Sequence, residues 1–181
     1  EKIIVVISPE DERAAAITRQ FEGNISTTMG GATRTDSVRA GLKALQDERI
    51  DHVYIHDAAR PFVTAALLSG LSTLLETYQA AAPALPIADA IKTLDGDSVD
   101  RDSLRRVQTP QAFHYDAIVA AFETTESGQS YADDIAVAHA AKLSIAFTQG
   151  DPDNFKVTYP EDFAKAASMI DQSYIATGSG F

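Results

Sequence analysis

A short apolar stretch that ends abruptly in polar residues, within Ile50–Phe62, most constrains what this chain can form. Val53–Ile55 has the β-branched and aromatic character of a buried strand. His56 and Asp57 end the apolar run, and two alanines and Arg60 follow them. Open α/β sheets bind ligands just beyond the carboxyl ends of their strands, so this stretch is a candidate ligand site. A polar loop with a surface Asp–Arg pair explains the same residues equally well.

Apolar runs alternate with amphipathic segments along the rest of the chain. Besides the central strand, the predicted strands are 2–7, 25–29, 80–87 and 143–148. The predicted helices are 9–21, 36–45, 64–79, 115–122, 133–141 and 160–170. Ser8 and Thr64 are the predicted caps of the first and third helices. The strand at 2–7 is almost uniformly apolar, as strands buried on both faces of a parallel sheet are.

This alternation predicts an α/β fold with a Rossmann-like, mostly parallel sheet flanked by helices. We expect one domain over residues 1–172, followed by a linker or the start of a second domain over 173–181. Residues 88–106 are rich in Asp and carry Lys92 and Arg101. Their length and charge predict an excursion from the core, here called the arm.

The composition excludes several classes of function. A net charge of −11 argues against a nucleic-acid surface, which needs a basic patch. It is compatible with a phosphorylated substrate, because a few convergent Arg and Lys side chains suffice. The chain has no cysteine, which excludes a disulfide, a thiolate zinc site and a cysteine nucleophile. No apolar run reaches the length of a membrane span, and we expect a cytoplasmic protein.

Two loops offer groups suited to anionic or polar ligands. Gly30 and Gly31 precede a predicted helix, where backbone N–H groups can approach a ligand closely. Asp153, Asn154 and Lys156 form a compact polar cluster after the last predicted strand. Most glycine pairs are ordinary turns, so the first signal is weak by itself.

Five stretches carry a resemblance to a known enzyme family: Gly30–Leu42, His56–Pro61, Val99–Leu104, Gln108–Phe113 and Asp153–Thr158. They occur in the same order as in the 2-C-methyl-D-erythritol 4-phosphate cytidylyltransferases of the non-mevalonate isoprenoid pathway. The chain resembles this family from residue 1 to about 172. The resemblance implies that a sugar-alcohol phosphate attacks the α-phosphate of CTP, with Mg²⁺ present, and releases pyrophosphate. Such chemistry depends on positioning and charge neutralisation rather than on a protein nucleophile.

The resemblance also implies substrate-binding roles. The backbone of Gly31 and Ala32 and the hydroxyl of Ser37 would read the cytosine edge. Asp57 would hold hydroxyls of the sugar alcohol, with Arg60 beside it. Ser37 has a second interpretation as a helix-start residue that bonds the backbone, and both can hold together.

Three further residues match family positions that contact phosphate. Thr109 would touch a phosphate, while Arg101 and Lys156 would be the catalytic cations that position the acceptor phosphate. Arg101 would lie on an arm that reaches into a neighbouring subunit, which implies a homodimer with shared sites. The alternatives are a turn residue for Thr109, a surface ion pair for Arg101 and a solvated loop lysine for Lys156.

The chain departs from the family pattern at its start. The family's first strand and its glycine-rich loop, with an Arg and a Lys that bind the triphosphate, would precede residue 1. We therefore expect upstream sequence to be missing. Ala90 stands where the family commonly has a Thr. Two other functions stay open: a ribitol 5-phosphate cytidylyltransferase, and a non-catalytic dimerisation fragment of the same fold.

The tail, Tyr174–Phe181, is apolar and rich in glycine. Its Ile-x-x-Gly-x-Gly-Phe pattern is similar to the opening strand of 2-C-methyl-D-erythritol 2,4-cyclodiphosphate synthase. Some bacteria fuse that domain to the cytidylyltransferase. We therefore expect a strand-like tail and a bifunctional protein, with an ordinary frayed terminus as the alternative.

Overall fold

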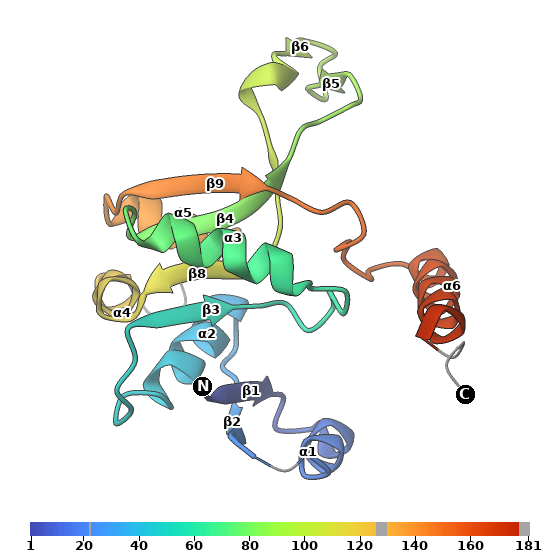
Figure 1. The fold of residues 1–181 in the computed structure, drawn as a ribbon. Helices are drawn as coiled ribbons and strands as arrows, with labels where there is room; N and C mark the ends of the chain where they lie inside the picture. The colour runs from blue at the N-terminus through green and yellow to red at the C-terminus, as the bar shows by residue number, and fades with distance from the viewer. Residues whose placement is uncertain (22, 126–129, 178–181) are drawn as a thin grey trace.

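The central sheet is organised around β4, a strand with mostly small side chains. The structure, a computed structural model, describes residues 1–21, 23–125 and 130–177 (Figure 1). One edge of β4 pairs with β8 and β7, the other edge pairs with β9, and β3 lies beyond β8. The strands of this sheet are β3 (His52–Ile55), β4 (Ala80–Leu85), β7 (Arg106–Val107), β8 (Gln111–His114) and β9 (Ile145–Gln149).

The sheet is mixed in direction, within the predicted α/β class. β3, β4 and β9 share one direction, because β3 and β4 are each antiparallel to β8 and β9 is parallel to β4. β8 and β7 run the opposite way. The prediction of a mostly parallel sheet therefore holds for β3, β4 and β9, the three strands that are linked through helices. The segment that contains β7 and β8 returns directly from the arm, without a crossover helix, and can therefore pair antiparallel.

The first two strands form a separate parallel pair, β1 (Ile3–Ile7) with β2 (Ile25–Met29). The expectation that the first strand is buried on both faces is wrong. Ile3 is 55% exposed and Val6 is 37% exposed, and only Ile7 of this strand is buried. In this two-stranded sheet the uniformly apolar sequence does not produce two covered faces.

The helices follow the predicted order with shifted ends. They are α1 (Glu12–Thr18), α2 (Arg34–Lys43), α3 (Ala65–Leu75), α4 (Tyr115–Glu123), α5 (Asp134–Ala140) and α6 (Pro160–Thr177). Asp11 rather than Ser8 caps α1, since its carboxylate accepts the N–H of Ala14. None of the helices in the described part of the chain combines the length and apolar character needed to cross a membrane.

The last helix is longer than predicted. α6 continues through Thr177, so the expected strand-like tail is wrong for residues 174–177. The remaining tail residues, 178–181, lie outside the described part of the chain.

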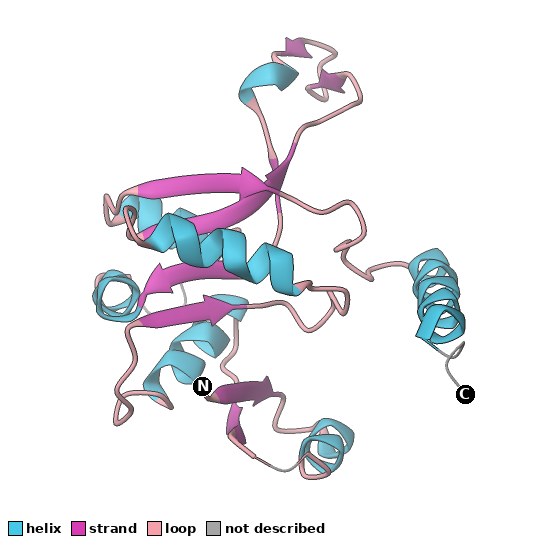
Figure 2. Cartoon of the chain, viewed as in Figure 1, coloured by secondary structure: helices cyan, strands magenta, loops and turns pink. Residues whose placement is uncertain are grey.

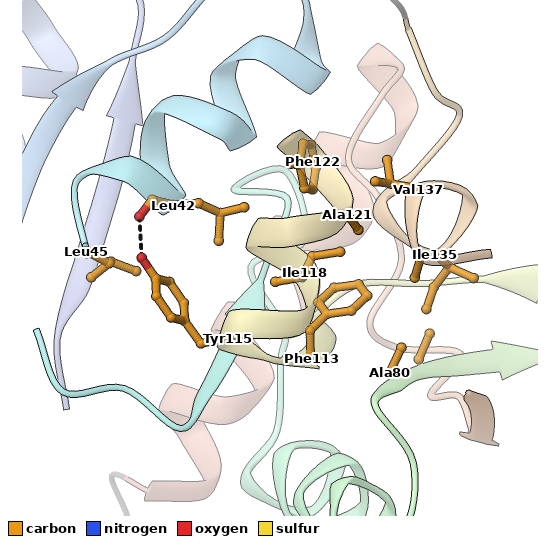
Figure 3. Packing of buried hydrophobic residues seen from close by; sticks show 12 residues of the cluster. Leu42, Leu45, Ala80, Phe113, Tyr115, Ile118, Ala121, Phe122, Ile135 and Val137 are labelled. Atoms are coloured by element: carbon orange, nitrogen blue, oxygen red, sulfur yellow. Dashed lines mark hydrogen bonds between the residues drawn. The ribbon is translucent and has the colours of Figure 1, made fainter. Parts of the chain in front are cut away.

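Helices cover β4 on both faces, and all six of its residues are buried. On one face, Leu71 and Leu75 of α3 pack against Ala81 and Ala112. On the other face, the larger cluster combines α2, α4 and α5 with Phe113, as Figure 3 shows. The small side chains of β4 explain how helices approach it so closely.

A buried hydrogen bond joins two helices within the larger cluster. The Tyr115 hydroxyl donates to the carbonyl oxygen of Leu42 at 2.8 Å (Figure 3). It therefore ties the start of α4 to the end of α2, the helix whose other end carries the Gly30–Gly31 loop.

The arm protrudes from the body, as predicted for residues 88–106 (Figure 2). It contains its own hairpin, β5 (Ile91–Lys92) with β6 (Ser98–Val99), and a 3₁₀ turn at Arg101–Ser103. The chain leaves the body at the end of β4 and returns in β7, which pairs with β4. The arm is therefore rooted in the centre of the sheet.

Thr64 is confirmed as a helix cap, because its hydroxyl oxygen accepts the N–H of Leu67 at 3.2 Å. We expect Thr64→Ala to lower the free energy of unfolding by about 1 kcal/mol, since that N–H loses its partner. Urea denaturation measures the change. Thr73→Ala in the exposed interior of the same helix is the control and should be neutral or slightly stabilising, because alanine has the higher helix propensity. Equal losses in both variants would contradict a capping role.

Candidate functional site

Three loops meet beyond the carboxyl end of β3. The first carries Asp57, the second carries Thr109 between β7 and β8, and the third carries Lys156 after β9. The backbone N–H of Asp57 donates to the Thr109 hydroxyl at 3.0 Å. The N–H of Val157 donates to the carbonyl of Ala59 at 2.8 Å. The structure thus brings together residues that lie as far as 99 positions apart in the sequence.

Hydrogen bonds indicate which nitrogen of His56 carries the proton. The carbonyl oxygen of Arg60 can only accept, so Nε2 of His56, 2.9 Å away, carries the proton that it donates there. In the neutral ring Nδ1 is then an acceptor and receives the hydrogen of the Thr109 hydroxyl at 3.0 Å, while the Thr109 oxygen accepts the N–H of Asp57. Burial lowers the pKa of His56, in agreement with a neutral ring. A direct phosphate contact by Thr109 would require one of these bonds to break, and that role stays a prediction.

Two buried amide side chains hold the Lys156 loop. Nε2 of Gln108 donates to the carbonyls of Asp151 and Asn154, and its Oε1 accepts the N–H of Asp151. Nδ2 of Asn154 donates to the carbonyl of Thr109 at 2.8 Å. A Cβ at Gly150 would lie 2.7 Å from Oε1 of Gln108, so this close packing requires glycine. Gln108 lies in a stretch that carried the family resemblance, but its role as a buried anchor was missed.

Asp57 lies between two cations. Its Oδ2 is 2.9 Å from Nζ of Lys156, and its Oδ1 is 3.3 Å from Nη2 of Arg34. Burial alone would raise the pKa of Asp57, but Lys156 and Arg34 outweigh it and hold that pKa below its ordinary value. Asp57 is therefore ionised at neutral pH. Arg34 was not among the predicted site residues.

Arg34 is itself held by a buried carboxylate. Its two terminal nitrogens lie 3.0 and 2.7 Å from the two oxygens of Asp134, which is 1% exposed. Burial raises the pKa of Asp134, and Arg34 opposes that rise by stabilising the charged form. The sequence predicted Asp134 only as the start of a helix. That prediction is confirmed, because Asp133 caps α5 and Asp134 is its first residue.

The predicted cytosine-reading residues lie at the start of α2. Thr33 caps this helix, which begins at Arg34, two residues before the predicted start. The Ser37 hydroxyl accepts the N–H of Gly31 at 3.2 Å and donates to the carbonyl of Thr33 at 3.0 Å. Ser37 therefore does bond the backbone at the helix start. A Cβ on Gly31 would lie 2.4 Å from Cβ of Asp36, so the loop packs too closely for any other residue.

Gly31 and Ala32 are exposed beside this hydroxyl. Their backbone is thus accessible to a ligand, and the cytosine role of the three residues stays a prediction.

Arg60 is directed at the third loop rather than at Asp57. Its Nη1 donates to the carbonyl of Asn154 at 2.9 Å. Its Nε is buried and has no hydrogen-bond partner within the described residues. Burial lowers the pKa of Arg60, with Asp57 opposing the shift. The ion pairs of Asp57 are with Lys156 and Arg34, which replaces the surface Asp–Arg pair considered from the sequence.

Arg101 stays within the arm. Its guanidinium donates to the carbonyl of Ala88 and lies 3.9 Å from a carboxylate oxygen of the exposed Asp102. The fold of one chain therefore does not bring Arg101 to Lys156. No group of three or more His, Asp or Glu side chains in the described residues could hold a metal ion.

Comparisons with known proteins agree with this architecture. A solved structure from Anaerococcus prevotii, titled 4-diphosphocytidyl-2C-methyl-D-erythritol synthase, superposes with a TM-score of 0.83 at 30% identity, over 94% of this chain and 78% of that one. This likeness places the fold in the α/β nucleotidyltransferase class.

Sequence relatives give the family. The family model for 2-C-methyl-D-erythritol 4-phosphate cytidylyltransferase matches residues 1–172. The enzyme of that name from Cereibacter sphaeroides is 45% identical over 174 residues, covering 93% of this chain and 76% of the relative. The chain belongs to the 2-C-methyl-D-erythritol 4-phosphate cytidylyltransferase family.

A two-domain relative matches as well. The bifunctional enzyme IspD/IspF of Maricaulis maris is 41% identical over 187 residues, which cover all of this chain and 49% of the relative. The chain thus spans about half the length of that protein.

Proposed function

We propose that this chain transfers the cytidylyl group of CTP to 2-C-methyl-D-erythritol 4-phosphate and releases pyrophosphate. The observation that carries the proposal is the meeting of Asp57 and Lys156, from two distant loops, at the carboxyl end of β3. The family and the relatives named above support this reaction over other uses of the same fold.

Lys156 would position the acceptor phosphate for attack on CTP. Its side chain is 47% exposed, and an oxygen of Asp57 is within 2.9 Å of its ammonium group. A phosphate can therefore approach the ammonium group from solvent. Asp57, held ionised by two cations, would accept hydrogen bonds from the hydroxyls of the sugar alcohol.

Gly31, Ala32 and Ser37 would bind cytosine. The exposed loop offers polar backbone groups that match the polar edge of a base, and the base would replace the bond that Gly31 N–H now makes to Ser37. Thr109 would contribute by holding the backbone of Asp57, and Arg60 by holding the Lys156 loop through Asn154.

Mg²⁺ is the divalent cation that we propose for the reaction. The described side chains do not form a dedicated magnesium site. The carboxylate of Asp57, which lies beside Lys156, already pairs with two cations. Magnesium binds nucleoside triphosphates mainly through phosphate oxygens and water, so it would enter with CTP.

We also propose a cytoplasmic homodimer in which the arm carries Arg101 into the neighbouring site. The arm projects from the body, and among the described residues the polar contacts of Arg101 are with Ala88 and Asp102 of the arm. Shared sites would explain why one chain separates the two catalytic cations. The partners are then CTP, a sugar-alcohol phosphate and a second copy, with neither nucleic acid nor membrane.

The domain organisation that we propose is a cytidylyltransferase domain over 1–172 joined to a cyclodiphosphate synthase domain. The alignment with the bifunctional relative, which continues through the whole chain, supports this organisation. The ribitol 5-phosphate enzyme and a non-catalytic fragment are the competing proposals.

The reaction products test these proposals. We expect the complete natural protein, given CTP, Mg²⁺ and 2-C-methyl-D-erythritol 4-phosphate, to form the cytidine diphospho sugar alcohol and one equivalent of pyrophosphate, detected by mass spectrometry. Product from ribitol 5-phosphate alone would support the first competitor. Absence of product together with no saturable heat on titration of CTP would support the non-catalytic fragment.

A further inference from the structure

Arg34 links three segments that are far apart in the sequence. It is the first residue of α2, and its guanidinium contacts Asp134 at the start of α5 and Asp57 after β3. Its bonds to Asp134 use both terminal nitrogens, at 3.0 and 2.7 Å. Its contacts with Asp57, from Nε and Nη2, are longer at 3.4 and 3.3 Å. One guanidinium therefore has a firm attachment on one side and a looser contact on the other.

The firm attachment is rigidly built. Gln111, which is 1% exposed on β8, accepts the N–H groups of both Asp134 and Ile135 at 2.9 Å. Its Nε2 donates to Asp133 at 3.0 Å. The start of α5 is thus fixed to the central sheet, and a buried carboxylate held there needs a cation beside it.

The looser contact completes the surroundings of Asp57. One carboxylate oxygen of Asp57 faces Arg34 and the other faces Lys156. Rotation of the carboxylate would break both contacts at once, so Arg34 limits the orientations open to Asp57. Without Arg34, Asp57 could turn freely towards Lys156, and the ammonium group would be neutralised more completely.

We propose that Arg34 is a positioning residue, which uses its buried anchor on Asp134 to fix the Asp57 carboxylate and so keeps Lys156 available to the acceptor phosphate. This inference rests on the proposed function. A guanidinium is needed because its planar fork can bond one carboxylate with two nitrogens and still reach a second. A lysine ammonium carries the same charge but lacks this geometry.

Arg34→Lys in the complete protein tests the inference. We expect the KM for the sugar-alcohol phosphate to rise about tenfold or more, because a misplaced carboxylate weakens both groups that hold the acceptor. The KM for CTP should change less. Arg39→Lys is the matched control: it lies on the same helix, has similar exposure and pairs with Asp36. It should leave both KM values unchanged.

Two outcomes would overturn the inference. The first is an Arg34→Lys enzyme with wild-type kinetics towards the acceptor. The second is an effect on acceptor KM that simply adds to that of Asp57→Asn in a double-mutant cycle, because a residue that acts through Asp57 must couple to it. If Arg34→Lys does not fold, Asp134→Asn replaces it, and an unchanged acceptor KM in that variant also overturns the inference.

The wild-type reaction in the same assay distinguishes failure of the positioning role of Arg34 from failure of the proposed function. An active wild-type enzyme with an unaffected Arg34→Lys variant overturns the positioning role alone. A wild-type protein that forms no product overturns the proposed function and the positioning role with it.

Discussion

Replacing Lys156 with alanine is expected to lower turnover about a hundredfold, equivalent to ~3 kcal/mol of transition-state stabilisation. The reason is that the ammonium group would offset negative charge on the phosphoryl groups during transfer. Folding should hardly change. The Lys156–Asp57 pair is partly exposed, and pairs of this kind contribute below about 1 kcal/mol.

The measurement combines steady-state kinetics with thermal unfolding of the complete protein. Lys2→Ala is the matched control, since Lys2 also pairs with one carboxylate, that of Glu48, at a partly exposed position away from the site. It should leave turnover unchanged. Wild-type turnover in Lys156→Ala, with an unaltered melting temperature, would remove Lys156 from the catalytic residues.

Mixing two inactive variants is expected to restore activity if the arm serves the neighbouring subunit. Arg101→Ala should inactivate the enzyme as Lys156→Ala does. A mixed dimer would then contain one site with both defects and one intact site. Random exchange at equal concentrations makes half the dimers mixed, so about a quarter of wild-type activity should return.

Two controls support this interpretation. Mixing Lys156→Ala with the Lys156→Ala, Arg101→Ala double variant creates no intact site and should restore nothing. Arg105→Ala removes another exposed arm arginine, whose guanidinium donates to the backbone carbonyls of Asp102 and Leu104, and should stay active. Absent recovery despite demonstrated subunit exchange would mean that Arg101 acts within its own chain.

The sequence predicted the parts of the fold that have a local signal. β3 and the polar residues after it were predictable because a β-branched run stops at His56 and Asp57. The Thr64 cap and the arm were also predictable, from a cap residue before an apolar stripe and from a long charged segment. β8 was missed because Gln111–His114 is short, lacks alternation and follows Pro110.

The candidate site was predictable only where a residue type matched the family. Asp57 and Lys156 were identified, but their contact could not be, because nothing local links positions 99 residues apart. Gln111 and Asn154 are buried only through tertiary packing, and amide side chains leave no periodic pattern. Arg34 was missed for a related reason: its two carboxylates come from other elements of the fold.

The amides that hold the loops suggest how this site tolerates sequence change. Gln108, Gln111 and Asn154 are almost fully enclosed and bind backbone groups, whereas Lys156 and Arg101 are partly exposed. A substitution among the enclosed amides leaves polar groups without partners and threatens the whole domain. A substitution among the exposed cations leaves the framework intact and changes how the site handles its substrates. Selection can therefore redirect such an enzyme towards a new acceptor while its framework stays constant.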